Sequence, residues 1–360
     1  MQKTVKPIPL GKISDEPLVS VWMTNYNYAD FLDESINSVL KQTYSNFELI
    51  ICDDGSTDRS LEIIGKYLKK DKRIKLIANK NGGIASALNS IYQISKGEII
   101  CFLDSDDYFA KTKIENVKND FQNCLNCGVH FNAMMRINKF GKREGRYPLI
   151  SSIPSGWLAE TVIKNSGGIL NVSPSSGISI RKEIAQKIFP LDIKLKSNID
   201  AIIINLSLLL TPAVSNERIL TYYRLHNKNL TNYSNLVLTP NEMLKGKKKN
   251  IELSKWVYHF TNEWISKNIN EKIKLNDIEN NWFYIEDMFV LNLLNKNKEE
   301  MKYWKKKLLN HQLTNKSKHL LFFYKISNFI PNYFLIRLLN IKYGQGKIKF
   351  LLSKILLKKH

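Results

Sequence analysis

The amino-acid sequence predicts an α/β fold, in which a mostly parallel β-sheet carries helices on both faces. The first observation is that short apolar runs alternate four times with helical patterns between residues 17 and 110, as in a parallel sheet with crossover helices. The second is that a polar cluster follows each apolar run. Because ligands bind outside the carboxyl ends of strands in such sheets, we expect a binding site here.

The four predicted strands are short, rich in β-branched and large apolar residues, and almost free of polar alternation, as expected of strands buried on both faces. They span residues 18–23, 47–52, 74–78 and 97–103. Apolar residues at helical spacing predict the intervening helices. These helices span residues 28–42, 61–68 and 84–94.

Asp104-Ser105-Asp106-Asp107 is the most informative of the polar clusters. Three carboxylates at the end of a buried strand repel one another unless a positive charge lies among them. Mg²⁺ and Mn²⁺ take oxygen ligands and bridge carboxylates to substrate phosphates, so a divalent cation is the expected partner. The alternative is a turn of solvated aspartates. The other clusters lie at equivalent strand ends and favour a binding site; they span residues 24–27, 53–58 and 79–83.

These motifs resemble those of the family 2 glycosyltransferases, which have the GT-A fold. The resemblance covers residues 17–110 in the same order and spacing and continues to about residue 234. Thr24-Asn25 is a departure, because the family usually has Pro-Thr there. The matching residues are Val19-Ser20-Val21, Tyr26-Asn27, Gln42-Thr43-Tyr44, Phe47-Glu48, Asp53 to Asp58, Asn81-x-Gly83, Gly97-Glu98 and Asp104 to Asp107.

The resemblance implies an inverting, metal-dependent transfer from a nucleotide-diphosphate sugar. The implied donor is a UDP-sugar, and the implied acceptor is a hydroxyl of a glycan or lipid-linked molecule in surface polysaccharide biosynthesis. The implied cofactor is Mn²⁺ or Mg²⁺. Asp104 matches the position that meets the ribose or the metal, and Asp106 matches the position that holds the metal against the diphosphate. His226 matches a position that contacts the metal or the diphosphate in some relatives; the alternative is a histidine that ends a strand.

The same resemblance implies a donor-binding set. Tyr26 and Asp54 match positions that stack on and hydrogen-bond the base, whereas Asp53 has the structural alternative of capping the following helix. Arg224 either neutralises diphosphate charge or pairs with a carboxylate of the site. Asp107 is expected to anchor the following loop. The implied donor-binding residues are Thr24, Tyr26, Asp53, Asp54, Lys80, Asp104 and Arg224.

Asp200 is the implied catalytic residue, and it precedes an apolar helix predicted over residues 201–210. The family usually has a Glu-Asp pair there, of which the Asp is the base, and Ile199 replaces the Glu in this chain. An inverting transfer needs a base to take the proton from the acceptor hydroxyl. Asp192 is a second candidate, better suited to shaping its loop. The structural alternative for Asp200 is a helix N-cap, which is compatible with catalysis.

Residues 111–238 are expected to hold the acceptor site. A strand is predicted over residues 129–137, and a helical stretch begins at Gly156. Trp157 is interpreted either as an acceptor-stacking ring or as a core residue. The Pro- and Ser-rich turn at residues 174–177 suits a loop that closes over a sugar, although such turns are also ordinary connectors.

Two domains are expected: a GT-A domain over residues 1–238, and a helical, basic C-terminal region over residues 239–360. The donor half of the first covers about 17–110, and the acceptor half covers 111–238. The 360-residue chain has a formal net charge of +21, which indicates an anionic partner. Fourteen Lys or Arg and no acidic residue follow Glu300, so two thirds of the net charge lie in the last sixth of the chain.

The basic residues of this last stretch are interleaved with apolar ones, which predicts interfacial helices on an anionic membrane surface. The alternative is a small helical bundle with a solvated basic face. Nucleic acid is not an expected partner, because the sequence contains no recognised nucleic-acid-binding module. The oligomeric state is not predicted.

Cysteine usage and hydropathy indicate a cytoplasmic protein. The N-terminus lacks the apolar core of a signal peptide, and no stretch reaches the roughly eighteen apolar residues of a membrane span. The expected location is therefore the cytoplasm, peripheral to the inner face of the cell membrane. The cysteines have neither disulfide-framework nor zinc-site spacing, so all four are expected to be free thiols: Cys52, Cys101, Cys124 and Cys127.

Two alternatives to a transferase are a nucleotide-sugar-binding protein and a nucleotidyltransferase with a related parallel sheet. A nucleotidyltransferase would carry a Gly-rich loop with Lys or Arg after its first strand, and residues 24–27 do not form one. A protein that only binds nucleotide sugars could dispense with Asp200 or with an aspartate of the Asp104–Asp106 pair, and this chain retains all three.

Overall fold

The computed structural model describes residues 5–148, 152–169, 171–195, 197–226, 229 and 239–311. The chain forms two compact units. The first comprises Met1–Glu160 and Leu170–Arg224, and the second comprises Thr161–Ile169 and Leu225–His360. The domain boundary predicted near residue 238 falls outside the described residues, as does the basic stretch after residue 311.

Four parallel strands form one half of the sheet in the first unit, in the order β3-β2-β1-β4. All four lie within two residues of their predicted bounds and are largely buried, which confirms the prediction. Thr24 is level with Cys52 on one side and with Asp104 on the other, so the carboxyl ends of three strands meet at one edge. The strands are β1 (Val19–Asn25), β2 (Phe47–Asp53), β3 (Ile74–Ala78) and β4 (Ile99–Asp104).

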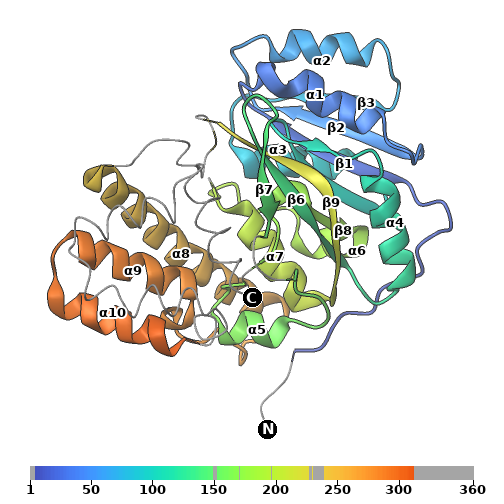
Figure 1. Ribbon diagram of the computed structural model, residues 1–360. Helices are drawn as coiled ribbons and strands as arrows, with labels where there is room; N and C mark the ends of the chain where they lie inside the picture. The colour runs from blue at the N-terminus through green and yellow to red at the C-terminus, as the bar shows by residue number, and fades with distance from the viewer. Residues whose placement is uncertain are drawn as a thin grey trace, which may run out of the picture. The chain divides into compact units, whose positions relative to one another are not determined.

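Antiparallel pairings extend the sheet beyond β4 to nine strands (Figure 1). The order continues β4-β8-β6-β9-β5, and β7 pairs with β6 as a hairpin. The two-residue β5 pairs with β9, which brings Arg224 beside the acidic cluster. The strands are β5 (Tyr108–Phe109), β6 (Val129–Asn138), β7 (Arg143–Tyr147), β8 (Ile178–Arg181) and β9 (Ala213–Leu225).

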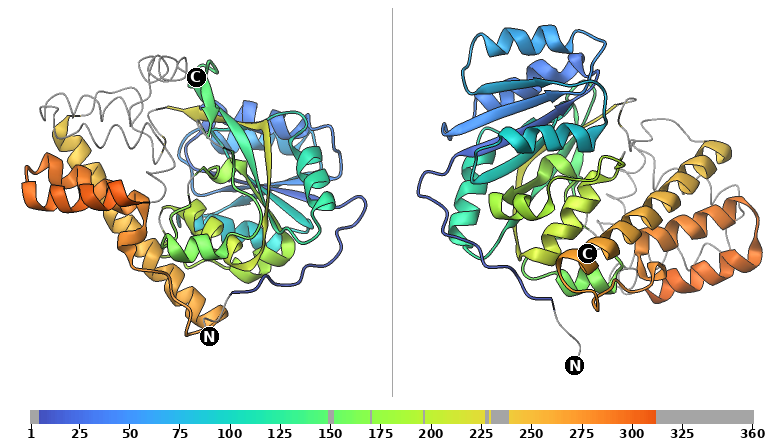
Figure 2. Two further views of the ribbon diagram at one scale, coloured as in Figure 1. Left: turned by 60° about the horizontal axis from the view of Figure 1, so that its bottom comes forward. Right: turned by 180° about the vertical axis from the view of Figure 1, so that it is seen from behind.

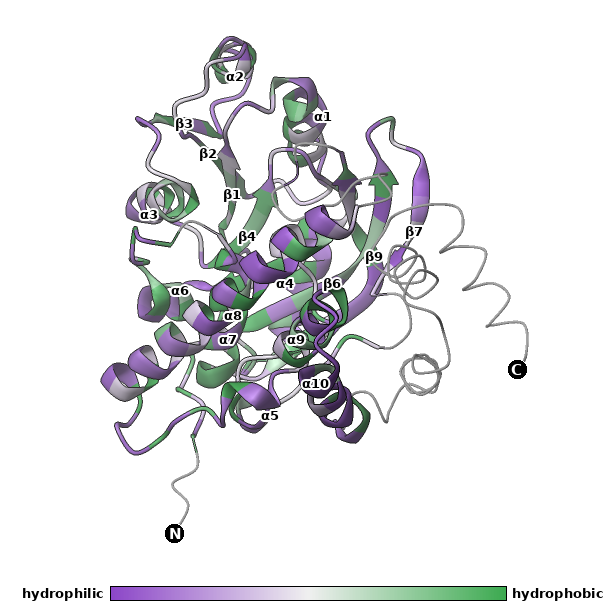
Figure 3. Ribbon diagram, turned by 90° about the vertical axis from the view of Figure 1, so that its left-hand side faces the viewer, coloured by the Kyte–Doolittle hydropathy of each residue, from purple (hydrophilic) through white to green (hydrophobic). Residues whose placement is uncertain are grey.

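Helices cover both faces of the parallel strands, as predicted (Figures 1 and 2). Successive residues of a strand point to opposite faces. Val21 and Met23 therefore join one core with α1 (Ala29–Leu40), α2 (Ser60–Leu68) and α4 (Lys113–Asn123). On the other face, the Trp22 ring packs against Tyr92 of α3 (Ile84–Ile94). Figure 3 shows the contrast between the hydrophobic β4 and the hydrophilic β7.

Four further helices precede α8, three of them in the first unit and the fourth running from the first unit into the second. The helix η1 (Ser175–Gly177) is a single 3₁₀ turn before β8, and α6 (Lys182–Ile188) follows that strand. The nearly all-buried α7 (Ile199–Leu210) confirms the apolar helix predicted there. The helix α5 (Ala159–Lys164) begins three residues after Gly156, whose backbone instead bridges to Ala213.

The second unit is helical, as predicted for this region. It contains α8 (Pro240–Asn268), η2 (Ile278–Asn280), α9 (Trp282–Leu294) and α10 (Lys298–Asn310). A capping box starts α8, because Thr239 and Glu242 each accept a backbone hydrogen bond from the other. Lys247 pairs with Asp287 between α8 and α9. In the part of the chain that the structure covers, no helix is long and apolar enough to cross a membrane.

The expectation of four free thiols is wrong for one pair. Cys124 and Cys127 form a disulfide in the turn between α4 and β6. The cause is local: the amide of Cys127 donates to the carbonyl of Cys124, and this turn brings the two Cα atoms to 5.4 Å. Cys52 and Cys101 are free and buried in the sheet, as expected.

Candidate active site at the carboxyl edge of the sheet

Three carboxylates converge where β4 ends. Asp104 is the last residue of β4, and Asp106 and Asp107 lie in the turn before β5. The amide of Asp107 donates to the carbonyl of Asp104 at 3.0 Å, which folds the turn back on itself. As a result, one carboxylate oxygen from each residue lies within 4.8 Å of the others. Asp106 and Asp107 are buried, and Asp104 is half-buried.

Burial and crowding raise the pKa of two of these carboxylates, Asp104 and Asp107. Burial, and then the charge of Asp106, raise the pKa of Asp104 to about 7. Burial and the charges of Asp106 and Asp104 raise the pKa of Asp107 well above its usual range. Burial of Tyr28, and then the charges of the three aspartates, raise the pKa of its hydroxyl. Sequence reasoning missed this neighbour of the cluster. A group of negative charges that is unfavourable in isolation favours a bound cation.

The chemistry of the cluster fits Mg²⁺ or Mn²⁺. Both ions take hard oxygen ligands, and the cluster offers carboxylate oxygens from three residues. Asp107 Oδ2 is buried and has no hydrogen-bond partner in the described part of the chain. The other oxygen, Oδ1, accepts a hydrogen bond from the Arg224 amide at 2.8 Å, which is the anchoring role predicted for Asp107. Oδ2 of Asp107 can therefore act as a ligand of an ion.

Two serines of η1 hold Asp104 in place, and sequence reasoning missed them. The Ser175 hydroxyl donates to Asp104 Oδ2, and the Asp104 amide donates to Ser176 Oγ at 3.0 Å. The carbonyl of Ser176 accepts from the Thr221 hydroxyl of β9 at 2.9 Å. The turn at residues 174–177 therefore supports the end of β4 and is itself held by β9.

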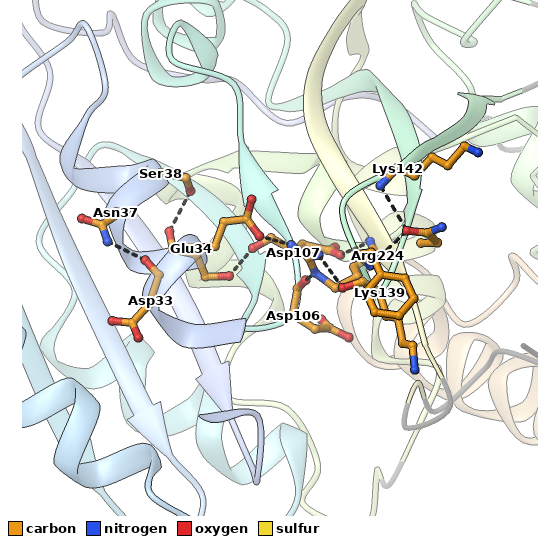
Figure 4. A network of polar contacts seen from close by, with 12 residues as sticks. Asp33, Glu34, Asn37, Ser38, Asp106, Asp107, Lys139, Lys142 and Arg224 are labelled. Carbon is orange, nitrogen blue, oxygen red and sulfur yellow. Dashed lines mark hydrogen bonds and ion pairs between the residues drawn. The ribbon is translucent and has the colours of Figure 1, made fainter. Parts of the chain in front are cut away.

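Arg224 fastens the acidic turn to its surroundings (Figure 4). Its Nε donates to the carbonyl of Asp106 at 2.9 Å, and its Nη2 pairs with Glu34 of α1. Its Nη1 donates to the carbonyl of Lys139 in the β6–β7 hairpin at 3.4 Å. The side chain is only 3% exposed. The carboxylate that pairs with Arg224 is that of Glu34, outside the acidic cluster, so both alternatives given for Arg224 stay predictions.

The residues predicted to hold a nucleotide base lie at the ends of β1 and β2. Tyr26 follows β1 with 46% of its surface exposed. Asp54 accepts hydrogen bonds from the amides of Gly82 and Gly83 at 2.9 and 2.8 Å, which ties the turn after β3 to the end of β2. Gly55 between these segments has φ +79°, and a Cβ there would lie 2.8 Å from the Asn81 nitrogen. This approach requires glycine.

The remaining predicted donor-binding residues have simpler surroundings. Asp53 accepts from Asn25 Nδ2 at 3.1 Å and from the Ser56 amide at 2.9 Å, so it has the structural role proposed for it, but in its own turn and not as the cap of α2. Lys80 is exposed in the turn after β3, and Thr24 is half-buried at the end of β1. His226 follows the last residue of β9 and belongs to the second unit, so its role as a metal ligand stays a prediction.

Asp200 lies in the first turn of α7, close enough to act on the acidic cluster electrostatically. Burial raises the pKa of Asp200 itself, and its charge contributes to the raised pKa of Asp104. The N-cap alternative is wrong, because Asn198 occupies that position with φ 55°. Asp192 is exposed and accepts from the Lys194 amide at 2.9 Å, which is the loop-shaping role expected of it.

Comparison with known proteins supports the same family. The model of the family described as glycosyl transferase family 2 matches residues 20–189, a range that contains the whole acidic cluster. Over residues 20–189 the chain is similar to glycosyl transferase family 2, the family that its motifs resemble.

Curated glycosyltransferases match parts of this chain. An uncharacterized glycosyltransferase of Nostoc sp. is 33% identical over 216 residues, or 59% of this chain and 66% of the relative. An Escherichia coli protein is 49% identical over 100 residues, or 28% of this chain and 39% of the relative. Its name is UDP-Glc:alpha-D-GlcNAc-diphosphoundecaprenol beta-1,3-glucosyltransferase WfaP. The chain thus spans less than two thirds of the length of these relatives.

A solved structure shares the fold. The crystal structure of S. aureus TarS 1–349 in complex with UDP-GlcNAc superposes with a TM-score of 0.51 and 19% sequence identity, covering 80% of this chain and 89% of that one. At this identity the likeness concerns the fold alone, and it confirms the predicted GT-A architecture.

Proposed function

We propose that this chain is an inverting, metal-dependent glycosyltransferase. It moves a sugar from a UDP-sugar to a hydroxyl of a glycan or lipid-linked acceptor in surface polysaccharide biosynthesis. The observation that carries the proposal is the convergence of three carboxylates at the carboxyl edge of the sheet, where the charge of Asp200 also acts on Asp104. The UDP-sugar is supported by the name of the E. coli relative and by the ligand in the S. aureus structure.

The exposed Tyr26 ring is the proposed stacking surface for the nucleotide base, beside Thr24. Asp54 already accepts two amide hydrogen bonds, but each carboxylate oxygen has two lone pairs and can accept a further N–H from the base. Lys80 is exposed in the adjoining turn and supplies positive charge for the diphosphate. Asp53 and Arg224 support this site from within, by holding the β2 turn and the acidic turn.

The metal site is proposed at Asp104 and Asp106, with the free oxygen of Asp107 as a further ligand. When bound, Mg²⁺ or Mn²⁺ would stabilise the negative charge of the departing nucleoside diphosphate. The protein prepares for this ion by holding three carboxylates together in a buried turn, at an electrostatic cost visible in the raised pKa of Asp104.

Asp200 is the proposed catalytic base. The acceptor oxygen forms a bond to the anomeric carbon as the bond from that carbon to the diphosphate oxygen breaks, and the hydroxyl proton passes to Asp200. Attack on the face opposite the leaving group inverts the anomeric configuration. Burial raises the pKa of Asp200, which brings the carboxylate nearer the range where a general base is effective at neutral pH.

The decisive experiment screens nucleotide sugars for donor turnover and for thermal stabilisation with Mn²⁺ or Mg²⁺ present. A UDP-sugar should raise the unfolding midpoint, and it should be consumed only when a divalent ion is supplied. Asp106→Ala, or excess EDTA, should abolish both turnover and the metal-dependent part of donor binding.

The matched control is Asp192→Asn, which removes an exposed carboxylate outside the cluster and should leave both measurements unchanged. Full activity in excess EDTA would exclude metal dependence. Tight donor binding with no turnover on any acceptor would favour a nucleotide-sugar-binding protein.

We further propose that the protein works in the cytoplasm, peripheral to the inner face of the cell membrane. The proposal is supported by the net charge of +21 and by the basic residues that alternate with apolar ones after Glu300. A lipid-linked acceptor would be confined to such a surface.

A further inference from the structure

The β6–β7 hairpin ends in a surface that the proposed transfer reaction does not use. We call residues 138–143 the basic tip; its sequence is Asn138-Lys139-Phe140-Gly141-Lys142-Arg143. Phe140 is 82% exposed, more than any other large hydrophobic residue that the structure describes. The three cations are also exposed, and none of them forms an ion pair within the described residues.

The basic tip has a defined shape. The side chain of Asn138 accepts hydrogen bonds from the amides of Phe140 and Lys142 at 3.0 and 3.1 Å. The amide of Gly141, which has φ +79°, donates to the Asn138 carbonyl at 2.9 Å. The turn therefore holds Phe140 outward, where Lys139 Nζ lies 4.8 Å from the ring centroid. The tip thus presents an exposed aromatic ring and a cation side by side.

The basic tip is joined to the acidic cluster through one arginine. The Arg224 guanidinium donates to the carbonyl of Lys139 in the tip and to the carbonyl of Asp106 in the cluster (Figure 4). Anything that binds the tip is therefore held beside the metal-binding turn.

We propose that the basic tip docks the protein on an anionic lipid bilayer. The Phe140 ring enters the interfacial region, and Lys139, Lys142 and Arg143 lie among the anionic headgroups. Aromatic and basic side chains side by side match the apolar and charged layers of such a surface. A protein partner fits less well, because a stable protein interface needs about 800 Å² from each side, far more than one ring and three cations provide.

Docking at the tip would place the carboxyl edge of the sheet against the membrane. A lipid-linked acceptor would then meet the acidic cluster without leaving the bilayer. This consequence rests on the proposed function, but docking itself does not, and it can be measured with neither donor nor acceptor present.

The experiment places a fluorescent reporter on the tip of the full-length chain. Cys52 and Cys101 are buried and the other two cysteines are bonded to each other, so Phe140→Cys introduces one reactive thiol for an environment-sensitive NBD label. With phosphatidylglycerol vesicles at low salt the emission should shift to the blue, and salt should reverse the shift. Phosphatidylcholine vesicles should give none. The controls are the unsubstituted chain, which should take up no label, and Leu61→Cys, exposed on α2.

Charge reversal separates the tip from other basic surfaces. Lys139→Glu with Lys142→Glu, in the labelled chain, should raise the vesicle concentration for the half-maximal shift about tenfold or more. Lys69→Glu with Lys72→Glu makes the same change of net charge at exposed positions elsewhere and should have a much smaller effect.

Three results would overturn the proposal. The first is a label at position 140 whose emission does not shift although the protein sediments with anionic vesicles, which would assign docking to the C-terminal region alone. The second is an equal shift with phosphatidylcholine vesicles. The third is an equal effect of the two charge-reversal pairs.

Discussion

At the scale of single residues, the acidic cluster gathers negative charge that favours the proposed metal ion. Asp104, Asp106 and Asp107 are held together by a tight turn, by Ser175 and by Arg224. The raised pKa of Asp104 reports its burial first and then the repulsion from Asp106. When folding raises the pKa of a carboxyl group, the free energy of unfolding of the protein falls as the pH rises toward that pKa. A bound divalent cation reverses this loss, so metal binding and folding are coupled at this turn.

Asp200→Asn tests the base. The amide keeps the shape of the side chain but takes no proton, so turnover should fall by roughly 10²- to 10⁴-fold. Donor affinity should change little, because the proposed base contacts the acceptor. The two quantities are measured by steady-state kinetics and by donor titration. If Asp200→Asn is active and Asp192→Asn is inactive, the base has been assigned to the wrong carboxylate.

Ser175→Ala tests the support of Asp104. Loss of the hydroxyl frees Asp104 Oδ2 from its hydrogen bond, and loss of such an outer partner typically costs about 10- to 100-fold in metal affinity. Mn²⁺ titration of the variant measures this. Ser179→Ala is the matched control, because its hydroxyl contacts Cys101 and not the cluster. Equal metal affinity in both variants would remove Ser175 from the site.

At the scale of elements, β6 links the core to the surface of the site. Its first half carries His130, fully buried, whose Nε2 lies 2.9 Å from Asp120 Oδ2 of α4. Its far end carries the basic tip. Burial lowers the pKa of His130 to about 4, so the ring is neutral in the folded protein at neutral pH. The strand is therefore sensitive to acid at its buried end.

His130 predicts a pH dependence of stability. The unfolded ring titrates near pH 6.5 and the folded ring near 4, so the unfolded chain binds an extra proton between these values. The free energy of unfolding should therefore rise with pH across this window, by up to about 3 kcal/mol, and this contribution should be complete above pH 6.5. His130→Gln removes the titration but keeps a donor for Asp120. Denaturant unfolding from pH 4 to 7 should give a flatter profile for the variant; parallel profiles would contradict the assignment.

At the scale of the whole molecule, charge is distributed unevenly. Residues 241–300 carry ten Lys and ten acidic residues, and the following sixty carry fourteen basic and no acidic ones. Helices α8 to α10 account for the first of these stretches. The first residues of this basic stretch lie in α10, and the rest lie beyond residue 311 and outside the described residues, so its membrane role remains a proposal from sequence.

Truncation before Lys316 tests the basic stretch. Each Lys or Arg near anionic lipid contributes on the order of 1 kcal/mol, so loss of the stretch should weaken sedimentation with anionic vesicles strongly while sparing hydrolysis of the donor. Salt should weaken binding of the intact chain in the same assay. If the truncated chain is insoluble and the intact chain ignores vesicles at low salt, the stretch is a packed structural bundle.

The sequence by itself determined the parallel half of the sheet and the location of the site. Strands buried on both faces have an unmistakable apolar composition, and β3 and α3 begin and end at the predicted residues. The acidic cluster was found because a parallel sheet gathers the carboxyl ends of its strands at one edge. Sequence also named Asp200, through the family motif.

Only the tertiary structure decided which residues hold the site together. Ser175 supports Asp104 from 71 positions away, and Arg224 meets Asp106 from 118 positions away. No local sequence pattern predicts such a contact, because the contact depends on the strand order β4-β8-β6-β9-β5. The spacing of apolar residues predicts single strands but not their order in the sheet. The disulfide of Cys124 and Cys127 likewise depends on a turn conformation, since spacing alone leaves two cysteines equally able to remain free.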